Sequence, residues 1–204
     1  MTVDGAADLE TLIRGSLEKF RDGLKRHAEP IGVVREFITH GPCVAISSEV
    51  HALLREAVAK HVNIHPNRDV YTVGSAKLGF SINPNHRYSH FGDESDVDVA
   101  IVSPELYGSL WREARSFVSS GGLWESDTLA DFQENHFRGY IKPDQMPVSL
   151  VTPTAASLWE LARELHQRQA AGPYAVTFVV WHDMDALEAY QGAAVAACQE
   201  SDRL

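Results

Sequence analysis

The chain has 204 residues, enough for one domain to bury a substantial core without support from disulfides or structural metals. Its content of 44% hydrophobic and 23% charged residues is typical of an ordinary soluble globular protein. With 28 acidic and 18 basic residues, the formal net charge is −10. This balance argues against a broad basic face for coating duplex DNA and favours a small polyanion as the partner.

Cysteine usage and hydropathy bear on the cellular compartment. Cys43 and Cys198 have no short metal-binding spacing and form no plausible disulfide framework, so we expect two reduced thiols. The acidic, polar N-terminus is unlike a secretory signal, and the longest strongly apolar run, residues 175–181, is too short to span a bilayer. These features predict a cytoplasmic protein with no membrane association.

Helix and strand patterns alternate along the first half of the chain. Apolar residues at helical spacing predict an amphipathic helix over residues 7–27, and a second helix is expected to begin near Ser47 or Ser48 as its cap. The segment between them, residues 33–39, fits either a short strand or a further helical turn. Residues 69–73 then have the pattern of a strand that runs into Gly74-Ser75.

The second half of the chain continues this alternation. A strand is expected from Asp96 to Val102, and Pro104 suits the first position of a following helix. Further helices are predicted near residues 126–135, from Thr154 onward and over 184–198, with a loop at 136–147 and a β-type run at 174–181. Without repeats or linkers, the sequence predicts a single mixed α/β domain spanning residues 1–204.

The most informative pattern is Asp96-Val-Asp98 at the head of an apolar strand. Residues i and i+2 of a strand project to the same face, so both carboxylates can hold oxygens around hard cations. Two such cations about 3.5–4 Å apart serve in-line phosphoryl transfer, and magnesium completes its shell with water and substrate phosphates. Asp96 and Asp98 are therefore the candidate catalytic residues and ligands of Mg²⁺ (or Mn²⁺).

A second pattern, Gly74-Ser75, follows the preceding strand. Glycine at this point lets the backbone approach a phosphate closely, and the Ser75 hydroxyl and nearby backbone N–H groups can donate to phosphate oxygens. Lys77 is the nearest cation and is expected to meet a triphosphate as a point charge. Gly74, Ser75 and Lys77 are therefore the candidate nucleotide-binding residues.

Together, a helix, a strand ending in Gly74-Ser75 and Asp96-x-Asp98 on the next strand resemble the signature of the DNA polymerase β-like nucleotidyltransferase superfamily. The resemblance extends from Ser48 to Ser103. It implies a catalytic palm, a mixed sheet flanked by helices. It also implies transfer of a nucleoside monophosphate from an NTP or dNTP to a hydroxyl, with release of pyrophosphate.

The chain departs from the family pattern at the third carboxylate, which members carry on a later strand. The best-placed strand is expected at residues 147–151 and has Ser149 where that acid would lie, and the strand expected at 175–181 has no acid before Asp183. Asp183 is a weak candidate for the missing carboxylate. The absence of the third acid puts deprotonation of the acceptor hydroxyl in question and leaves nucleotide binding unaffected.

The polar residues of the chain also allow other interpretations. A calcium loop fails because Ala100 and Ile101 replace a required oxygen ligand and glycine, and no P-loop pattern exists. Residues 83–90 are expected to form a mobile loop at the rim of the site, where Arg87 and Tyr88 contact the base or acceptor, or else a surface loop without a role. Arg138 and Lys142 fit simple surface charge better than triphosphate ligands.

The biological setting follows from the resemblance alone. Small relatives with this signature make nucleotide signals in antiphage defence, which is the favoured expectation, with a homo-oligomer or a partner effector protein as associate. The alternatives are a toxin–antitoxin type transferase that modifies protein or RNA, and a catalytically degenerate module that binds nucleotide without turning it over.

Overall fold

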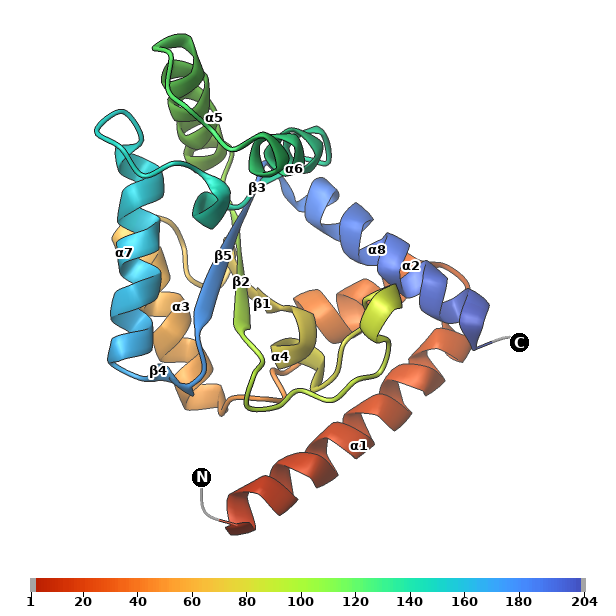
Figure 1. Cartoon of the computed structure of the whole chain (residues 1–204). Coiled ribbons are helices and arrows are strands. Elements are labelled where there is room, and N and C mark those ends of the chain that lie inside the picture. Colours follow the sequence, from red (N-terminus) through yellow and green to blue (C-terminus); the bar gives the residue numbers. More distant parts are fainter. Residues whose placement is uncertain (1–2, 203–204) are drawn as a thin grey trace.

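A four-stranded mixed sheet lies at the centre of the chain, and helices cover both of its faces (Figure 1). The computed structural model describes residues 3–202. The strands have the spatial order β1-β2-β5-β3, and their bounds are β1 (Val70–Val73), β2 (Val97–Val102), β5 (Val176–Trp181) and β3 (Tyr140–Ile141). β1 runs antiparallel to β2, β2 runs parallel to β5, and β3 runs antiparallel to β5. A short segment, β4 (Ala170–Pro173), lies outside this sheet.

The remaining elements are helical. The α-helices are α1 (Val3–Arg26), α2 (Pro30–Val33), α3 (Ser48–Val62), α4 (Gly74–Leu78), α5 (Pro104–Ser119), α6 (Ser126–Phe137), α7 (Pro153–Gln167) and α8 (Met184–Ser201). A π-helix continues α2 over Val34–Thr39, and single 3₁₀ turns occupy Pro84–His86 and Pro143–Gln145. The architecture is α/β, as the sequence predicts.

Most predicted elements are confirmed, and their ends follow local chemistry. Ser47 caps α3 by accepting a hydrogen bond from the Val50 N–H, and Ser103 caps α5 in the same way, directly before Pro104. Residues 33–39 are helical. The loop expected at 136–147 contains β3, which is only two residues long and therefore too short for a periodic pattern. The strand expected at 147–151 is wrong, since this segment is a turn in which Thr152 Oγ1 donates to the Pro147 carbonyl.

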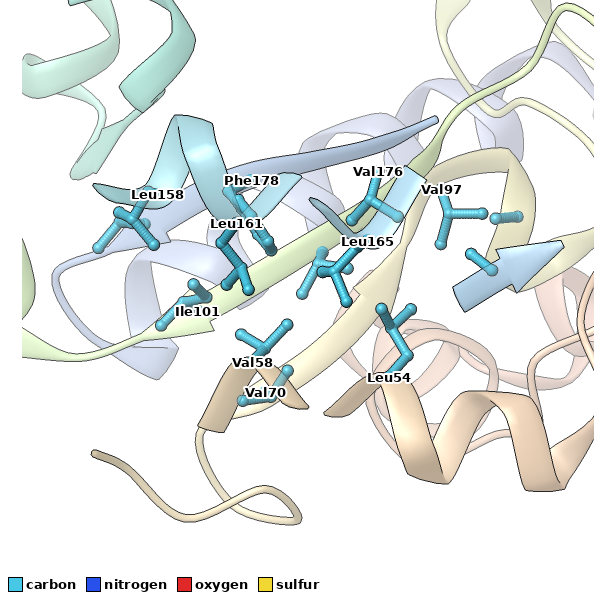
Figure 2. Packing of buried hydrophobic residues seen from close by; sticks show 14 of the residues in the cluster. Leu54, Val58, Val70, Val97, Ile101, Leu158, Leu161, Leu165, Val176 and Phe178 are labelled. Atoms are coloured by element: carbon cyan, nitrogen blue, oxygen red, sulfur yellow. The ribbon is translucent and has the colours of Figure 1, made fainter. Parts of the chain in front are cut away.

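One face of the sheet packs against α3, α5, α6 and α7 through a large apolar cluster. Alternate residues of β2 and β5 point to this face because side chains alternate along a strand. Figure 2 shows Leu54 and Val58 of α3, and Leu158, Leu161 and Leu165 of α7, packed around Val97, Ile101, Val176 and Phe178 of the sheet. This layer is closed by apolar contacts.

The opposite face of the sheet is covered by α1, α2, the π-helix and α8. Phe20 of α1, Val33 of α2 and Leu187 of α8 are fully buried there, together with Val73 and Trp181 of the sheet. Polar residues of β2 and β5 also face this side, because Asp98 and Thr177 alternate with the buried valines that face the other helices. The polar side chains of Asp98 and Thr177 therefore lie on the face of the sheet that α8 covers.

Candidate functional site

Strand pairing brings the two sequence motifs together. Val73 at the end of β1 lies opposite Asp98 in β2, so Gly74 lies beside the Asp98 carboxylate. Gly74 has a φ of +66°, and a Cβ built on it would overlap Asp98 Oδ2. Only glycine fits this position without strain, for two independent reasons: the left-handed backbone and the close carboxylate. The space that the sequence assigned to an approaching phosphate is thus occupied, in part, by Asp98.

The Asp98 carboxylate is largely withdrawn from solvent. Its Oδ1 accepts a 2.7 Å hydrogen bond from Thr177 Oγ1, across the paired position of the neighbouring parallel strand. Burial raises the pKa of Asp98, and the negative charges of Asp96 and Asp144 raise it further. The Thr177 hydrogen bond and the charge of Lys142 lower the pKa but do not offset burial. A nearby cation would therefore be a favourable partner for the ionised carboxylate.

Asp96 is placed differently from Asp98. It immediately precedes β2 and is exposed, and it is close enough to Asp98 for its charge to affect the pKa of that group. Within residues 3–202, no group of three or more His, Cys, Asp or Glu side chains is arranged to hold a metal ion. Asp96 and Asp98 are the two carboxylates at this end of β2, and the charge of Asp144 also acts on Asp98.

Asp98 opens onto a cavity of about 800 Å³ between the sheet and α8. Gly74 and Ser75 line it beside Asp98, and the segment Ser81–Pro84 forms part of its wall. Alternate residues of the β3 region line it on the far side of β5, namely Arg138, Tyr140 and Lys142. The remaining lining residues come from β5 and α8, and they include Val179, Trp181, Ala186, Ala189, Tyr190, Gln191, Ala193 and Ala194.

Lys77 and Lys142 lie in places that differ from those expected from the sequence, which favoured Lys77 as a triphosphate ligand and Lys142 as surface charge. Lys77 is 3% exposed, and its amino group donates to the Gly41 carbonyl, away from the cavity. Lys142 lines the cavity and is half-buried, and its amino group has no hydrogen bond or ion pair within the described part of the chain. The structure therefore does not bring Lys77 to Gly74, Ser75 and Asp98, and it brings Lys142 there instead.

The segment at 83–90 is only partly at the rim. Asn83 and Pro84 line the cavity, whereas Tyr88 packs edge-on against Phe80 and donates a hydrogen bond to Asp202. The Arg21 guanidinium lies 4.7 Å from the centroid of the Tyr88 ring. Arg87 and Tyr88 are not among the lining residues, so the expected contact between these two side chains and a ligand in the cavity is not supported.

Neither of the two positions considered for a third carboxylate, Ser149 and Asp183, lies beside Asp98. Ser149 lies in the turn before α7 and contacts Thr152, far from the sheet pairing of Asp98. Asp183 caps α8 by accepting from the Ala186 N–H. It lies six residues beyond Thr177, or about 20 Å along the strand direction. Neither residue reaches Asp98, and the strand position beside it is held by Thr177.

Sequence reasoning missed the wall formed by β3 and α8. Arg138, Tyr140 and Lys142 follow the period of two that a strand requires, but the strand itself is too short for the pattern to stand out. Gln191 and Tyr190 lie in a helix whose alanine-rich sequence indicates packing, and nothing in it indicates a cavity. Only the pairing of β5 with both β2 and β3 places these residues opposite Gly74 and Asp98.

Comparison with known proteins adds no further constraint. Of the described residues, no helix is both long and apolar enough to cross a membrane. No protein-family model matches the chain, and no curated protein or solved structure matches it either.

Proposed function

We propose that the protein is a metal-dependent nucleotidyltransferase with a polymerase β-like palm. The observation that carries this proposal is the contact between Gly74 and Asp98 at the mouth of the cavity, with Ser75 and Lys142 beside them. A glycine turn, a hydroxyl donor, a carboxylate and an unpaired cation then line one end of a single cavity. These are the groups that binding a triphosphate through a metal ion requires.

Each residue has a definite role in the proposal. Lys142 would neutralise charge on the triphosphate as a point cation, and the Ser75 hydroxyl, which has no hydrogen-bond partner within residues 3–202, would donate to a phosphate oxygen. Arg138 forms an ion pair with Glu134 at 2.5 Å and is half exposed, so it can swing toward an anion in the cavity. Catalysis would rest on positioning and charge neutralisation.

The residues fit a magnesium ion held jointly with a substrate. Asp98 has a raised pKa because it is buried, and Asp96 adds a second, exposed carboxylate nearby. Magnesium uses one or two carboxylates and takes its remaining ligands from phosphates and water. When bound, it would neutralise the charge that develops on the transferred phosphoryl group. Asp96 and Asp98 would hold it.

A second candidate function is nucleotide binding without transfer, and Thr177 favours it. This residue takes the place beside Asp98 where a third carboxylate would assist in deprotonating the acceptor. A threonine hydroxyl does not act as a base near neutral pH. The carboxylates of Asp96 and Asp98 would bind the cation and would not serve as the base.

One experiment separates these two functions. The protein is incubated with each NTP and dNTP and with Mg²⁺ or Mn²⁺, and both nucleotide binding and pyrophosphate release are measured. Binding with release supports transfer, and binding without release supports the second candidate. Asp98→Asn, which keeps an acceptor for Thr177, should abolish metal-dependent binding. If wild type binds no nucleotide under any of these conditions, both functions are wrong.

A further inference from the structure

The end of the cavity away from Asp98 is aromatic. Tyr140 of β3, Trp181 of β5 and Tyr190 of α8 form one cluster, with ring centroids 4.6 Å apart for Tyr140 and Trp181 and 5.4 Å apart for each of these rings and Tyr190. All three rings line the cavity; Tyr140 and Trp181 are buried, whereas Tyr190 is 41% exposed. The two buried rings therefore support Tyr190 by edge and tilted contacts and leave part of it open to the cavity.

This aromatic end is displaced from the carboxylate along the strands. Thr177 is paired with Asp98, and Trp181 follows four residues later in the same strand. At the rise of a β-strand, the displacement is about 13 Å. A ligand with a charged end at Lys142 and Asp98 would thus reach the aromatic cluster only with a second, distal group.

Gln191 supplies a polar group at the same end. It is 7% exposed and lines the cavity, and its amide makes no hydrogen bond within residues 3–202. The amide atoms are not fully enclosed by protein, so they are free to bond to a ligand in the cavity. A glutamine amide presents a donor and an acceptor side by side, which matches the paired donor and acceptor positions on the edge of a nucleobase.

The other residues that α8 contributes to the cavity are small and uncharged. Ala186, Ala189, Ala193 and Ala194 project only a methyl group from α8, and none of the residues that α8 contributes to the cavity is charged. A flat apolar group can therefore approach the helix closely, between the alanine methyl groups and the Tyr190 ring. Charged or bulky groups are poorly matched to it.

We propose that this end of the cavity is a nucleobase-binding subsite. The base stacks on Tyr190, which Tyr140 and Trp181 hold in place, and its edge exchanges hydrogen bonds with the Gln191 amide. The inference deepens the proposed function, on which it rests for the placement of the triphosphate at Lys142 and Asp98. It assigns selection among bases to α8 and not to the segment at 83–90.

The test measures affinities by titration calorimetry at constant Mg²⁺ for ATP, GTP, CTP, UTP and inorganic tripolyphosphate. Tyr190→Leu should weaken all four nucleotides by about tenfold, because base–aromatic stacking is lost, and leave tripolyphosphate unchanged. Tyr190→Phe should recover most of the lost affinity, since it retains the ring. Trp159→Leu is the matched control, because Trp159 is an exposed aromatic residue of α7, on the other side of the sheet, and should change nothing.

Gln191→Leu tests the polar contact separately. Because the amide has no partner, its replacement should leave the melting temperature unchanged or raised, and the variant should fold. The ratios among the four nucleotide affinities should shift by fivefold or more. Unchanged ratios, or an unchanged affinity of Tyr190→Leu for all four nucleotides, would overturn the subsite.

The binding measurements distinguish a failure of the subsite from a failure of the proposed function. If wild type binds neither nucleotides nor tripolyphosphate but binds free nucleosides, and Tyr190→Leu weakens them, the proposed function fails and the subsite stands. If nucleotides and tripolyphosphate bind with equal affinity, the triphosphate site stands and the subsite fails. If none of these ligands binds, both are rejected.

Discussion

The hydroxyl of Thr177 donates a 2.7 Å hydrogen bond to the partly buried carboxylate of Asp98 across two parallel strands. Replacing Thr177 with Asp would set a second carboxylate directly against the first. Like charges at this distance repel, so Thr177→Asp should destabilise the metal-free protein by roughly 1–3 kcal/mol. Saturating Mg²⁺ should restore most of that loss, because the cation compensates both charges.

Thermal melts with and without Mg²⁺, and after its removal by chelation, measure this effect. Thr177→Asn is the control, since it has a similar shape without the charge and should show no recovery with Mg²⁺. An equal melting temperature of the Asp variant in Mg²⁺ and in chelator would mean that no cation binds near Asp98.

Gly74 and Gly121 offer a matched pair for testing the contact with Asp98. Both have positive φ, but a Cβ on Gly121 would meet nothing within 4 Å, whereas one on Gly74 would overlap Asp98 Oδ2. Gly121→Ala should therefore cost only the backbone strain, about 1 kcal/mol. Gly74→Ala should cost about 1–2 kcal/mol more, since a buried carboxylate must move as well. Urea denaturation measures the free energy of unfolding of both variants. Equal losses would show that the Asp98 carboxylate can move aside without cost.

Substitutions of Lys142 and Lys77 test whether the anion binds at the cavity or beside the lysine of the sequence motif. Lys142→Met should weaken tripolyphosphate binding about tenfold, on the order of 1.4 kcal/mol, because an unpaired cation is removed from the cavity. Lys77→Met should leave that affinity unchanged, because the Lys77 amino group is bonded to the Gly41 carbonyl elsewhere. Titration calorimetry at two salt concentrations checks both, and the Lys142 effect should shrink at high salt. The reverse ranking would restore Lys77 to the binding site.

His51 predicts how the stability depends on pH. Burial lowers the pKa of His51 from 6.5 to about 4, and the charges of Arg55 and Lys77 add to the shift. In the unfolded chain, His51 therefore binds a proton below about pH 6.5, whereas in the folded protein it binds one only below about pH 4. Stability from this residue is fully present above pH 6.5 and is lost as the pH falls toward 4. For a half-buried group the loss is on the order of 1–2 kcal/mol.

Urea denaturation between pH 4 and 7 measures this dependence. His51→Gln should flatten the curve, whereas His61→Gln, in the same helix but exposed, should leave it as in wild type. A wild-type slope in His51→Gln would show that other groups account for the pH dependence.

The elements with strong local signals could be predicted from the sequence. The helix cap at Ser47, the helix start at Pro104, the apolar strand after Asp96 and the β-type run at 174–181 all depend on neighbouring residues alone, and all are confirmed. The nearness of Gly74 to Asp98 also follows from the resemblance, because the motif links adjacent strands.

The rest depends on long-range pairing, which a single sequence does not reveal. Nothing local to Thr177 indicates that it lies beside Asp98, and nothing local to Lys142 indicates that it faces the same cavity. Nearness in sequence to Ser75 does not bring the Lys77 amino group to the cavity. Within α4, Lys77 lies two positions after Ser75 and so points to a different side of the helix, toward the core.

The central place of β5 in the sheet has a consequence for biosynthesis. β5 pairs with β2 on one side and β3 on the other, so β3 can join the β1-β2 pair in one sheet only after residues 176–181 have left the ribosome. Until then, the nascent chain carries β2 as an unpaired apolar edge, which is prone to self-association. A chain released before residue 176 would contain the complete Gly-Ser and Asp-x-Asp pattern and yet have no cavity. Synthesis itself therefore delays the appearance of the site until residues 176–181 have been made.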